Sequence, residues 1–316
     1  MKQLKFNWPF QLSNFMGFCS LALGAVVLLG WYLHEPALIQ VNPAFVPMQY
    51  NTALGFALAG LALLLLVWSR PRLAAGPGLA VLLVGVLTLI EYIFGVDLHI
   101  DQLFMQHYID LETSSPGRMA PNTALCFSLT GSAILVAAWR GRRPRAPAWI
   151  ATIGAIIIGL GIVAFAGYII GVESAYGWGH LTRMAIHTAA GFMILGTGFV
   201  ALAWAGEKQG ADGQRLPRWI PLVIGITGST ITLTLWQAMV AQERRMVSEM
   251  GPQATNYADE SLLVFGILLT LTLVYKFRAA VKVDLKDRGS GQTLVPYITV
   301  ALGALLSFSL YSLLKT

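Results

Sequence analysis

The chain reads Met48-Gln-Tyr-Asn51-Thr-Ala-Leu-Gly-Phe56, and the same pattern returns as Met119-Ala-Pro-Asn122-Thr-Ala-Leu-Cys-Phe127 and Met184-Ala-Ile-His187-Thr-Ala-Ala-Gly-Phe192. The register continues in each copy, with a Gly nine residues and a Trp seventeen residues after the Asn or His. These residues are Gly60, Gly131 and Gly196, followed by Trp68, Trp139 and Trp204. Self-similarity at a regular spacing is typical of an internal repeat.

Each copy starts an apolar stretch, and an earlier apolar stretch ends at Tyr32, Tyr92 or Tyr168. The unit is therefore a pair of membrane helices, and all copies enter the bilayer in the same direction. We expect residues 13–204 to form a bundle of three repeated helix pairs around an axis along the membrane normal. Residues 205–316 are expected to supply three further transmembrane helices and a basic cytoplasmic loop.

Composition places the chain among all-α, polytopic membrane proteins, since 56% of its residues are hydrophobic, 11% are charged and the mean hydropathy is +0.66. Nine apolar stretches approach the ~20 residues that cross a bilayer. The predicted spans are 13–33, 52–68, 74–94, 122–139, 148–171, 185–204, 219–240, 261–277 and 293–314.

Basic residues give the predicted orientation. Sixteen of the 21 Lys and Arg lie on one side of this topology, and the other five are Arg118, Arg183, Arg244, Arg245 and Lys315. Cytoplasmic loops are enriched in basic residues, so the N-terminus is expected in the cytoplasm and the C-terminus outside. Topology and anionic membrane lipid explain the net charge of +6, and no basic patch on a soluble domain indicates nucleic-acid binding.

Two roles are open for Asn51, Asn122 and His187, which start the second helix of each unit at the outer side. As helix caps, the Asn side chains would satisfy free backbone N–H groups, while the Phe and Gly that follow pack between helices. As binding residues, the three side chains would line the mouth of a ligand pocket, with His187 as its titratable member. Because His is a poor cap, His187 indicates a ligand-binding or proton-sensing role.

Charged residues complete the candidate ligand site. Glu91 is the most deeply embedded acidic residue, and it is expected either to pair with Arg118 or Arg183 or to reach the interface. The outer segment 95–121 is acidic with interleaved aromatic residues, and it is either an amphipathic helix over the bundle or a solvated connector. Met and His on the outer side are of the type that binds copper or haem, but their spacing is not specific. No metal ligand and no cofactor is therefore assigned.

Two further features predict packing roles. A polar stripe on the seventh predicted span, from Thr227 to Gln237, favours helix association over a conducting path. Cys19 and Cys126 lie inside predicted spans and have no neighbour at metal or redox spacing, so both are expected to fill the apolar core.

Longer phrases around the repeat carry a family resemblance. They are Gly117-Arg118-Met119-Ala-Pro-Asn122-Thr-Ala-Leu, Tyr168-Ile-Ile-Gly171-Val172-Glu-Ser-Ala-Tyr176-Gly177, Met184-Ala-Ile-His187-Thr-Ala and Trp236-Gln-Ala-Met-Val-Ala-Gln242-Glu243. Over residues 15–245 the chain resembles the N-terminal multi-span sensor region of bacterial sensor histidine kinases and diguanylate cyclases. The resemblance implies signal input at the bacterial inner membrane. Where that family has an output domain after the eighth span, this chain has a short basic loop and a ninth span.

The leading functional hypothesis is a sensor-like binding module that detects a small hydrophobic ligand and signals through a membrane-protein partner. No motif of a kinase, a cyclase, a phosphate-binding loop or a Ser-His-Asp hydrolase is visible, so no enzymatic activity is expected. The alternative hypothesis is an auxiliary subunit of a larger membrane complex that holds lipid, quinone or pigment. A transporter or channel is a third hypothesis, weakened by repeats that are parallel rather than inverted.

Overall fold

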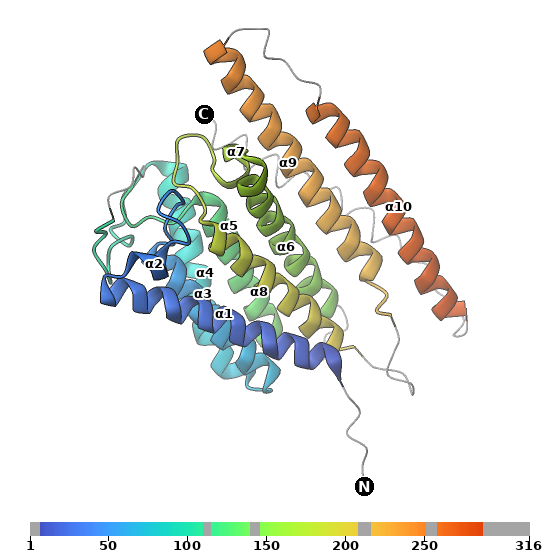
Figure 1. The fold of residues 1–316 in the computed structure, drawn as a ribbon. Coiled ribbons are helices and arrows are strands. Elements are labelled where there is room, and N and C mark those ends of the chain that lie inside the picture. Colours follow the sequence, from blue (N-terminus) through green and yellow to red (C-terminus); the bar gives the residue numbers. More distant parts are fainter. Residues whose placement is uncertain (1–6, 110–114, 140–145, 208–215, 251–257, 287–316) are drawn as a thin grey trace.

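The computed structural model describes residues 7–109, 115–139, 146–207, 216–250 and 258–286. Over these residues the protein is all-α, with ten helices and no strand (Figure 1). The helices are α1 (Trp8–Leu33), α2 (Pro36–Ile39), α3 (Tyr50–Val67), α4 (Pro71–Phe94), α5 (Pro121–Trp139), α6 (Ala146–Ile170), α7 (Glu173–Tyr176), α8 (Ile186–Ala205), α9 (Ile220–Met250) and α10 (Ala258–Lys286).

Eight of these helices are long and apolar enough to cross a membrane, namely α1, α3, α4, α5, α6, α8, α9 and α10. The first eight predicted spans fall on them, although α1 starts before the predicted residue 13 and both α9 and α10 extend beyond their predicted ends. The ninth predicted span, 293–314, lies outside the described residues. The chain is thus a multi-span helical membrane protein.

Three helices, α3, α5 and α8, form the centre of the bundle and contact one another. Three others surround them, since α1 packs against α3 and α8, α4 packs against α3 and α5, and α6 packs against α5 and α8. The contacts therefore close into a ring of six helices. On one side of this ring α9 packs against α6, and α10 packs against α9 (Figure 1).

One phenylalanine from each central helix meets the other two in the core. The ring centroids of Phe56 and Phe127 are 5.1 Å apart, and Phe192 lies 4.9 Å from both. All three rings are buried and meet in tilted or edge-to-face orientations, which are favourable aromatic geometries. Phe127 lies against Gly55 and Phe56 against Gly191, where a side chain would block the ring. The prediction that these Phe residues pack between helices is confirmed.

The central helices touch the backbones of their outer neighbours at three glycines. A methyl group added at Gly60 would lie 2.4 Å from a backbone nitrogen of α1, and one at Gly131 would lie 2.5 Å from a backbone nitrogen of α4. At Gly196 it would lie 2.6 Å from a backbone oxygen of α6. Helix backbones approach this closely only where the side chain is absent, so the predicted close contacts are confirmed.

Neither Asn51 nor Asn122 stands at the cap position, although Asn122 Oδ1 accepts a hydrogen bond from the Thr123 N–H at 3.0 Å, as the capping role expected. α3 begins at Tyr50 and α5 begins at Pro121, so each Asn is the second residue of its helix. His187 likewise is the second residue of α8. The backbone turns into the helix earlier than expected, which frees these three side chains to contact other segments.

The hydroxyl side chains of α9 pack against neighbouring helices. Thr227 Oγ1 donates a hydrogen bond of 3.4 Å to a backbone carbonyl of α6. Gly159 of α6 lies against Thr230, and Gly266 of α10 lies against Thr232. These contacts agree with the helix-association role predicted for the polar stripe.

We predict different effects on thermal stability for two Gly→Ala substitutions inside membrane helices. Gly131→Ala should lower the midpoint of thermal unfolding in detergent, because the added methyl clashes with α4 and overpacking costs about 1–3 kcal/mol. Gly76→Ala, at a position with nothing within 4 Å of the added methyl, should leave the midpoint unchanged or raise it through better helix propensity. Equal midpoints for the two variants would contradict the close helix contact.

Candidate functional site

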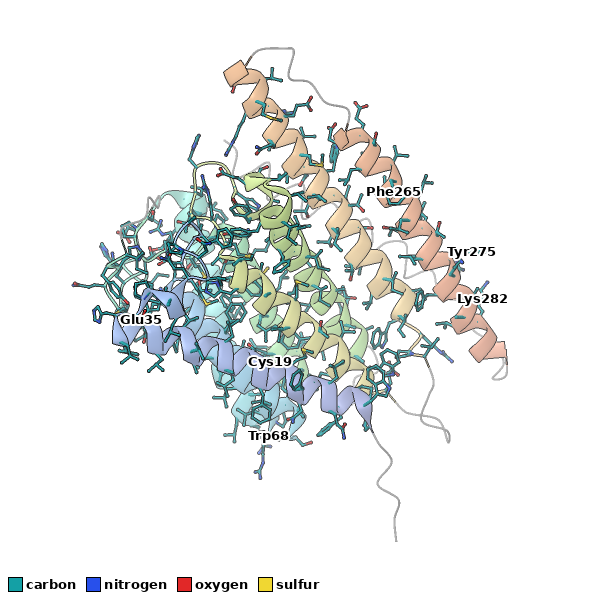
Figure 2. All side chains as sticks on the ribbon, in the orientation of Figure 1. Cys19, Glu35, Trp68, Phe265, Tyr275 and Lys282 are labelled. Carbon is teal, nitrogen blue, oxygen red and sulfur yellow. The ribbon has the colours of Figure 1, made fainter. Side chains whose placement is uncertain are left out.

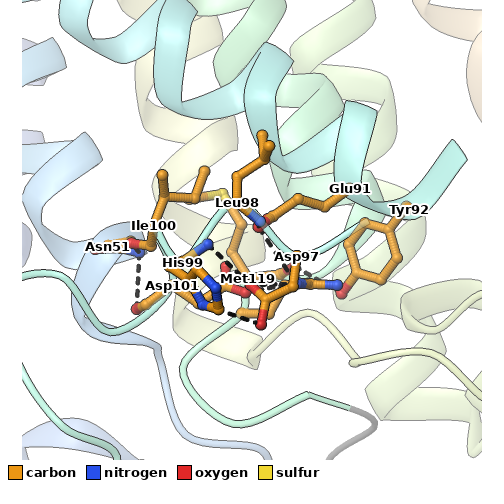
Figure 3. A network of polar contacts seen from close by, with 10 residues as sticks. Asn51, Glu91, Tyr92, Asp97, Leu98, His99, Ile100, Asp101 and Met119 are labelled. Carbon is orange, nitrogen blue, oxygen red and sulfur yellow. Dashed lines mark hydrogen bonds and ion pairs between the residues drawn. The ribbon is translucent and has the colours of Figure 1, made fainter. Parts of the chain in front are cut away.

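Polar side chains gather at one end of the bundle, where α3, α5 and α8 begin and α1, α4 and α6 end. We call this the motif end. Asn51 Nδ2 donates to the carbonyls of Ile100 and Asp101, at 3.1 and 3.0 Å, in the segment after α4 (Figure 3). Asn122 Nδ2 donates to the carbonyl of Tyr176 in α7, at 3.2 Å. Each Asn therefore holds a connecting segment that follows an outer helix.

His187 occupies the corresponding position in α8 but is bonded differently. It interacts with the backbone carbonyl of Ile39 in α2, and that carbonyl already accepts a hydrogen bond from the Met48 N–H at 3.0 Å. Both ring nitrogens of His187 are buried, and neither makes a hydrogen bond of good geometry with the described residues. The imidazole therefore has unused hydrogen-bonding capacity in a buried place.

Gln49 also carries unused polar atoms at the motif end. This residue precedes α3 and is buried, and neither its amide oxygen nor its amide nitrogen has a partner among the described residues. In the other two copies of the pattern its place is taken by the buried residues Ala120 and Ala185. Gln49 was not among the predicted site residues. It could have been recognised in the sequence, because it is polar at a position where the pattern otherwise has Ala.

Aromatic side chains fix the entrance of each central helix. Trp31 Nε1 donates to the Met48 carbonyl at 3.0 Å, Tyr92 OH donates to the Met119 carbonyl at 3.0 Å, and Tyr168 OH donates to the Met184 carbonyl at 2.8 Å. Two of the three tyrosines noted in the sequence, Tyr92 and Tyr168, therefore make this hydrogen bond. In α1 the residue that makes this bond is Trp31, while Tyr32 is hydrogen bonded to Tyr50 OH at 2.7 Å.

Arg118 lies among three carboxylates, that of Glu91 near the end of α4 and those of Asp97 and Asp101 in the segment after it. Figure 3 shows these three acidic residues close together. Its Nε donates to Asp101 Oδ2 at 2.7 Å, and its Nη2 lies 3.3 Å from Glu91 Oε1 and 3.7 Å from Asp97 Oδ1. The guanidinium also lies over the Tyr92 ring, 5.5 Å from its centroid. The side chain of Glu91 is fully buried and that of Asp101 is only 10% exposed. Of the two partners considered for Glu91, Arg118 is therefore the one that it meets.

The environment of the cluster shifts the pKa values of Asp101 and Arg118, which lie outside the helices. Burial raises the pKa of the Asp101 carboxyl above its ordinary value, although the adjacent Arg118 guanidinium lowers it. Burial lowers the pKa of Arg118, but the hydrogen bond and negative charge of Asp101 outweigh it and hold this pKa above its ordinary value. The described residues between Gly95 and Ala120 form no helix, so the carboxylates of Asp97 and Asp101 are carried by a loop.

Arg183, the other candidate arginine, makes a separate and exposed contact. Its Nη2 lies 3.1 Å from Glu173 Oε2 in α7, and Arg245 of α9 approaches the same oxygen at 3.9 Å. The side chains of Arg183 and Glu173 are each 43% exposed. Exposed ion pairs of this kind contribute little to stability.

The six candidate residues thus fall into three groups at the motif end. Glu91 and Arg118 meet in the cluster that Asn51 also holds through the Asp101 backbone. Asn122 and Arg183 both contact α7, and His187 faces α2. The missed members of the first group are Asp97 and Asp101, which follow the end of α4 at Gly95. An acidic pair just beyond a helix that carries Glu91 was the signal that could have indicated them.

One group of side chains has the geometry for a metal ion. Oxygens of Glu91, Asp97 and Asp101 lie within 4.8 Å of one another. Among the described residues no histidine or cysteine belongs to such a group, so the copper or haem site considered from Met and His gains no support there. Cys126 is buried in the core, as expected, and Cys19 is partly buried.

Comparison of the chain with known protein families, with curated proteins and with solved structures found no match.

We predict that the two arginines differ strongly in their effect on stability. Arg118→Gln leaves three carboxylates without their cation, and breaking a buried pair in this way costs about 3–5 kcal/mol. Arg183→Gln should cost less than about 1 kcal/mol, because its partner is exposed. Thermal and denaturant unfolding of both variants in one detergent checks this. Similar losses of unfolding free energy in the two variants would show that the Arg118 ion pairs are no stronger than exposed ones.

Proposed function

We propose that the chain is a membrane-embedded binding module that senses a small ligand at the motif end and acts through a partner protein, without catalysis of its own. The observation that carries this proposal is the set of buried polar atoms of His187 and Gln49 at that end, none of which makes a hydrogen bond of good geometry with the described residues. Leaving buried hydrogen-bonding groups unused costs about 1–3 kcal/mol for each group. Retaining them is understandable if a ligand supplies the missing partners.

The proposal is supported by an internal repeat, which we propose for residues 13–204. On this view the helix pairs α1 and α3, α4 and α5, and α6 and α8 are three copies of one unit. The Phe contacts, the glycine contacts and the bonds to the Met carbonyls recur once in each pair. Contacts that recur in all three pairs serve packing, whereas a residue that departs from the pattern invites another explanation.

His187 and Gln49 are such departures. His187 stands where the other copies have Asn51 and Asn122, and these two amides are satisfied by backbone carbonyls. Gln49 stands where the other copies have Ala, which has no polar atoms to satisfy. Both departures add polar atoms to a buried place, and in neither do the described residues use them. Packing alone favours Asn and Ala at these two positions.

The unused groups indicate the chemistry of the ligand. An imidazole and a primary amide offer hydrogen-bond donors and acceptors without a fixed charge. The surrounding residues at the start of the central helices are largely apolar and buried. A small, mostly hydrophobic molecule with one or two hydrogen-bonding groups suits such a place.

Charge distribution supports a location in a bacterial inner membrane with the N-terminus in the cytoplasm. The motif end would then face the outer side, where a sensor receives its signal. The resemblance of residues 15–245 to the membrane sensor regions of histidine kinases and diguanylate cyclases supports the same role. Signalling through another protein fits a chain in which no catalytic motif is visible.

We predict that purified wild-type protein retains a small molecule and that His187→Asn loses it. Asn is the residue of the other two copies, so this variant should fold normally while retaining about tenfold less ligand, the equivalent of 1.4 kcal/mol. Native mass spectrometry and extraction from gentle detergent measure the retained molecule. The control is His180→Asn, an exposed histidine at the same end. Equal retention by His187→Asn and wild type, or no retained molecule in wild type, would refute the binding role.

An auxiliary-subunit role remains the second candidate because α10 exposes an apolar surface. Only 6% of its most apolar stretch is buried, and among the described helices it packs mainly against α9. Phe265 and Tyr275 lie on this exposed surface (Figure 2). Its exposed apolar residues are Val264, Phe265, Ile267, Leu268, Leu269, Leu271, Leu273, Tyr275 and Phe277. Such a surface suits either lipid or the transmembrane helix of another subunit.

A photo-crosslinking residue at Leu271 separates these alternatives in native membranes. A stable complex predicts one discrete protein adduct at Leu271 and none at Leu79, which is an exposed apolar residue of α4. A lipid-facing α10 predicts lipid adducts at both positions. Adduct formation is read by gel shift and mass spectrometry, and a protein adduct at Leu271 would favour the auxiliary subunit.

A further inference from the structure

The cluster around Arg118 holds more negative than positive charge. Three carboxylates, from Glu91, Asp97 and Asp101, face one guanidinium. The remaining basic group nearby is His99, whose Nδ1 lies 3.3 Å from Asp97 Oδ2 and whose side chain is 88% exposed. The carboxyl groups therefore outnumber the guanidinium by two. Burying an uncompensated charge is costly, so this arrangement calls for a further positive charge.

Two oxygens of the cluster make no hydrogen bond of good geometry with the described residues, although the Glu91 and Asp101 carboxyl groups lie close enough to interact with each other. Glu91 uses Oε1 to accept the Leu98 N–H at 2.9 Å and to meet Arg118, but its Oε2 is buried without a donor among the described residues. Asp101 uses Oδ2 for Arg118, and its Oδ1 is likewise buried and unpartnered. The Glu91 side chain is fully buried. Arg118 therefore contacts one oxygen of each of these two carboxylates and leaves the other oxygen free for a further ligand.

From these observations we propose that Glu91, Asp97 and Asp101 bind a divalent cation of the size of Ca²⁺. Oxygens of the three residues lie within 4.8 Å of one another. Calcium binds oxygen ligands at about 2.3–2.6 Å, so two oxygens on one ion lie at most about 5 Å apart. Magnesium requires about 2.0–2.1 Å and a near-octahedral shell, which this spacing fits less well. A charge of +2 also matches the uncompensated charge of the cluster.

The surrounding loop is already held in place for the ion. Asn51 fixes the backbone at Ile100 and Asp101, and Glu91 fixes the backbone at Leu98. Ion binding joins the end of α4 to the segment that follows it, next to the entrance of α5. The inference goes beyond the proposed function, because it concerns a different group of residues at the motif end and a different class of ligand.

A shared proton between Glu91 and Asp101 is the competing explanation for the two unpartnered oxygens. It supplies a donor for one carboxylate and removes one negative charge. It does not involve Asp97, whose side chain is 61% exposed. The role of Asp97 therefore distinguishes a bound cation from a shared proton.

The test uses the full chain, stripped with EDTA and purified in a neutral detergent that carries no anionic lipid. Terbium is the probe, since it replaces calcium and its luminescence is excited through a nearby aromatic ring such as Tyr92. We expect saturable terbium binding at one ion per chain, displacement by Ca²⁺ at lower concentration than by Mg²⁺, and a thermal midpoint that rises with Ca²⁺ concentration.

Asp97→Asn is the decisive variant, because Asp97 is exposed and its loss does not leave a buried charge. It should weaken Ca²⁺ binding by about tenfold or more while the thermal midpoint in EDTA stays at or above that of wild type. Glu173→Gln removes an exposed carboxylate at the same end, outside the cluster, and should leave Ca²⁺ binding unchanged. Unchanged affinity in Asp97→Asn, or stabilisation of wild type by acid but not by Ca²⁺, would overturn the proposal.

The outcome is independent of the test of the proposed function. His187→Asn should bind terbium as wild type does, because His187 faces α2 and lies outside the cluster. Absence of terbium binding in a protein that still retains its small molecule refutes the cation site alone. Terbium binding without a retained molecule refutes the role of His187 and leaves the cation site standing.

Discussion

The close contact between helix backbones at Gly60, Gly131 and Gly196 is the constraint on which the remaining structure depends. In lipid the hydrophobic effect gives little drive for one apolar helix to join another, so packing and hydrogen bonds must hold the bundle. Because these three residues have no side chain, the backbones of α3, α5 and α8 can approach those of α1, α4 and α6 closely. The central Phe contacts and the hydrogen bonds at the motif end depend on this close approach, because they require the central helices to lie near one another.

Sequence predicted those features that depend on order along the chain. Apolar length located eight helices, and the fixed offsets of Phe and Gly from Asn or His correctly indicated residues that pack between helices. The same offsets did not decide between the two roles that were open for Asn51 and Asn122. Spacing shows that a residue lies at a helix start, but it does not show that the helix begins one residue earlier and that the side chain meets another segment.

The candidate site was harder to predict, because its contacts join segments whose proximity only the fold decides. The depth of Glu91 in its helix could be predicted, but Arg118 and Arg183 were equally possible partners, because only the fold brings the end of α4 next to the segment before α5. Asp97 and Asp101 are two acidic residues of a polar segment, and the sequence does not show that Asp101 is buried with its carbonyl bonded to Asn51. Two arginines in similar sequence contexts thus acquire different environments, one enclosed by carboxylates and one open to solvent.

The layer formed by Phe56, Phe127 and Phe192 has an electrical consequence. These rings fill the centre of α3, α5 and α8 with groups that neither hydrate nor carry ions, and each ring is at most 1% exposed. A chain of water molecules along that centre would be interrupted there. The layer is therefore an apolar barrier between the polar side chains of the motif end and the opposite end of these three helices.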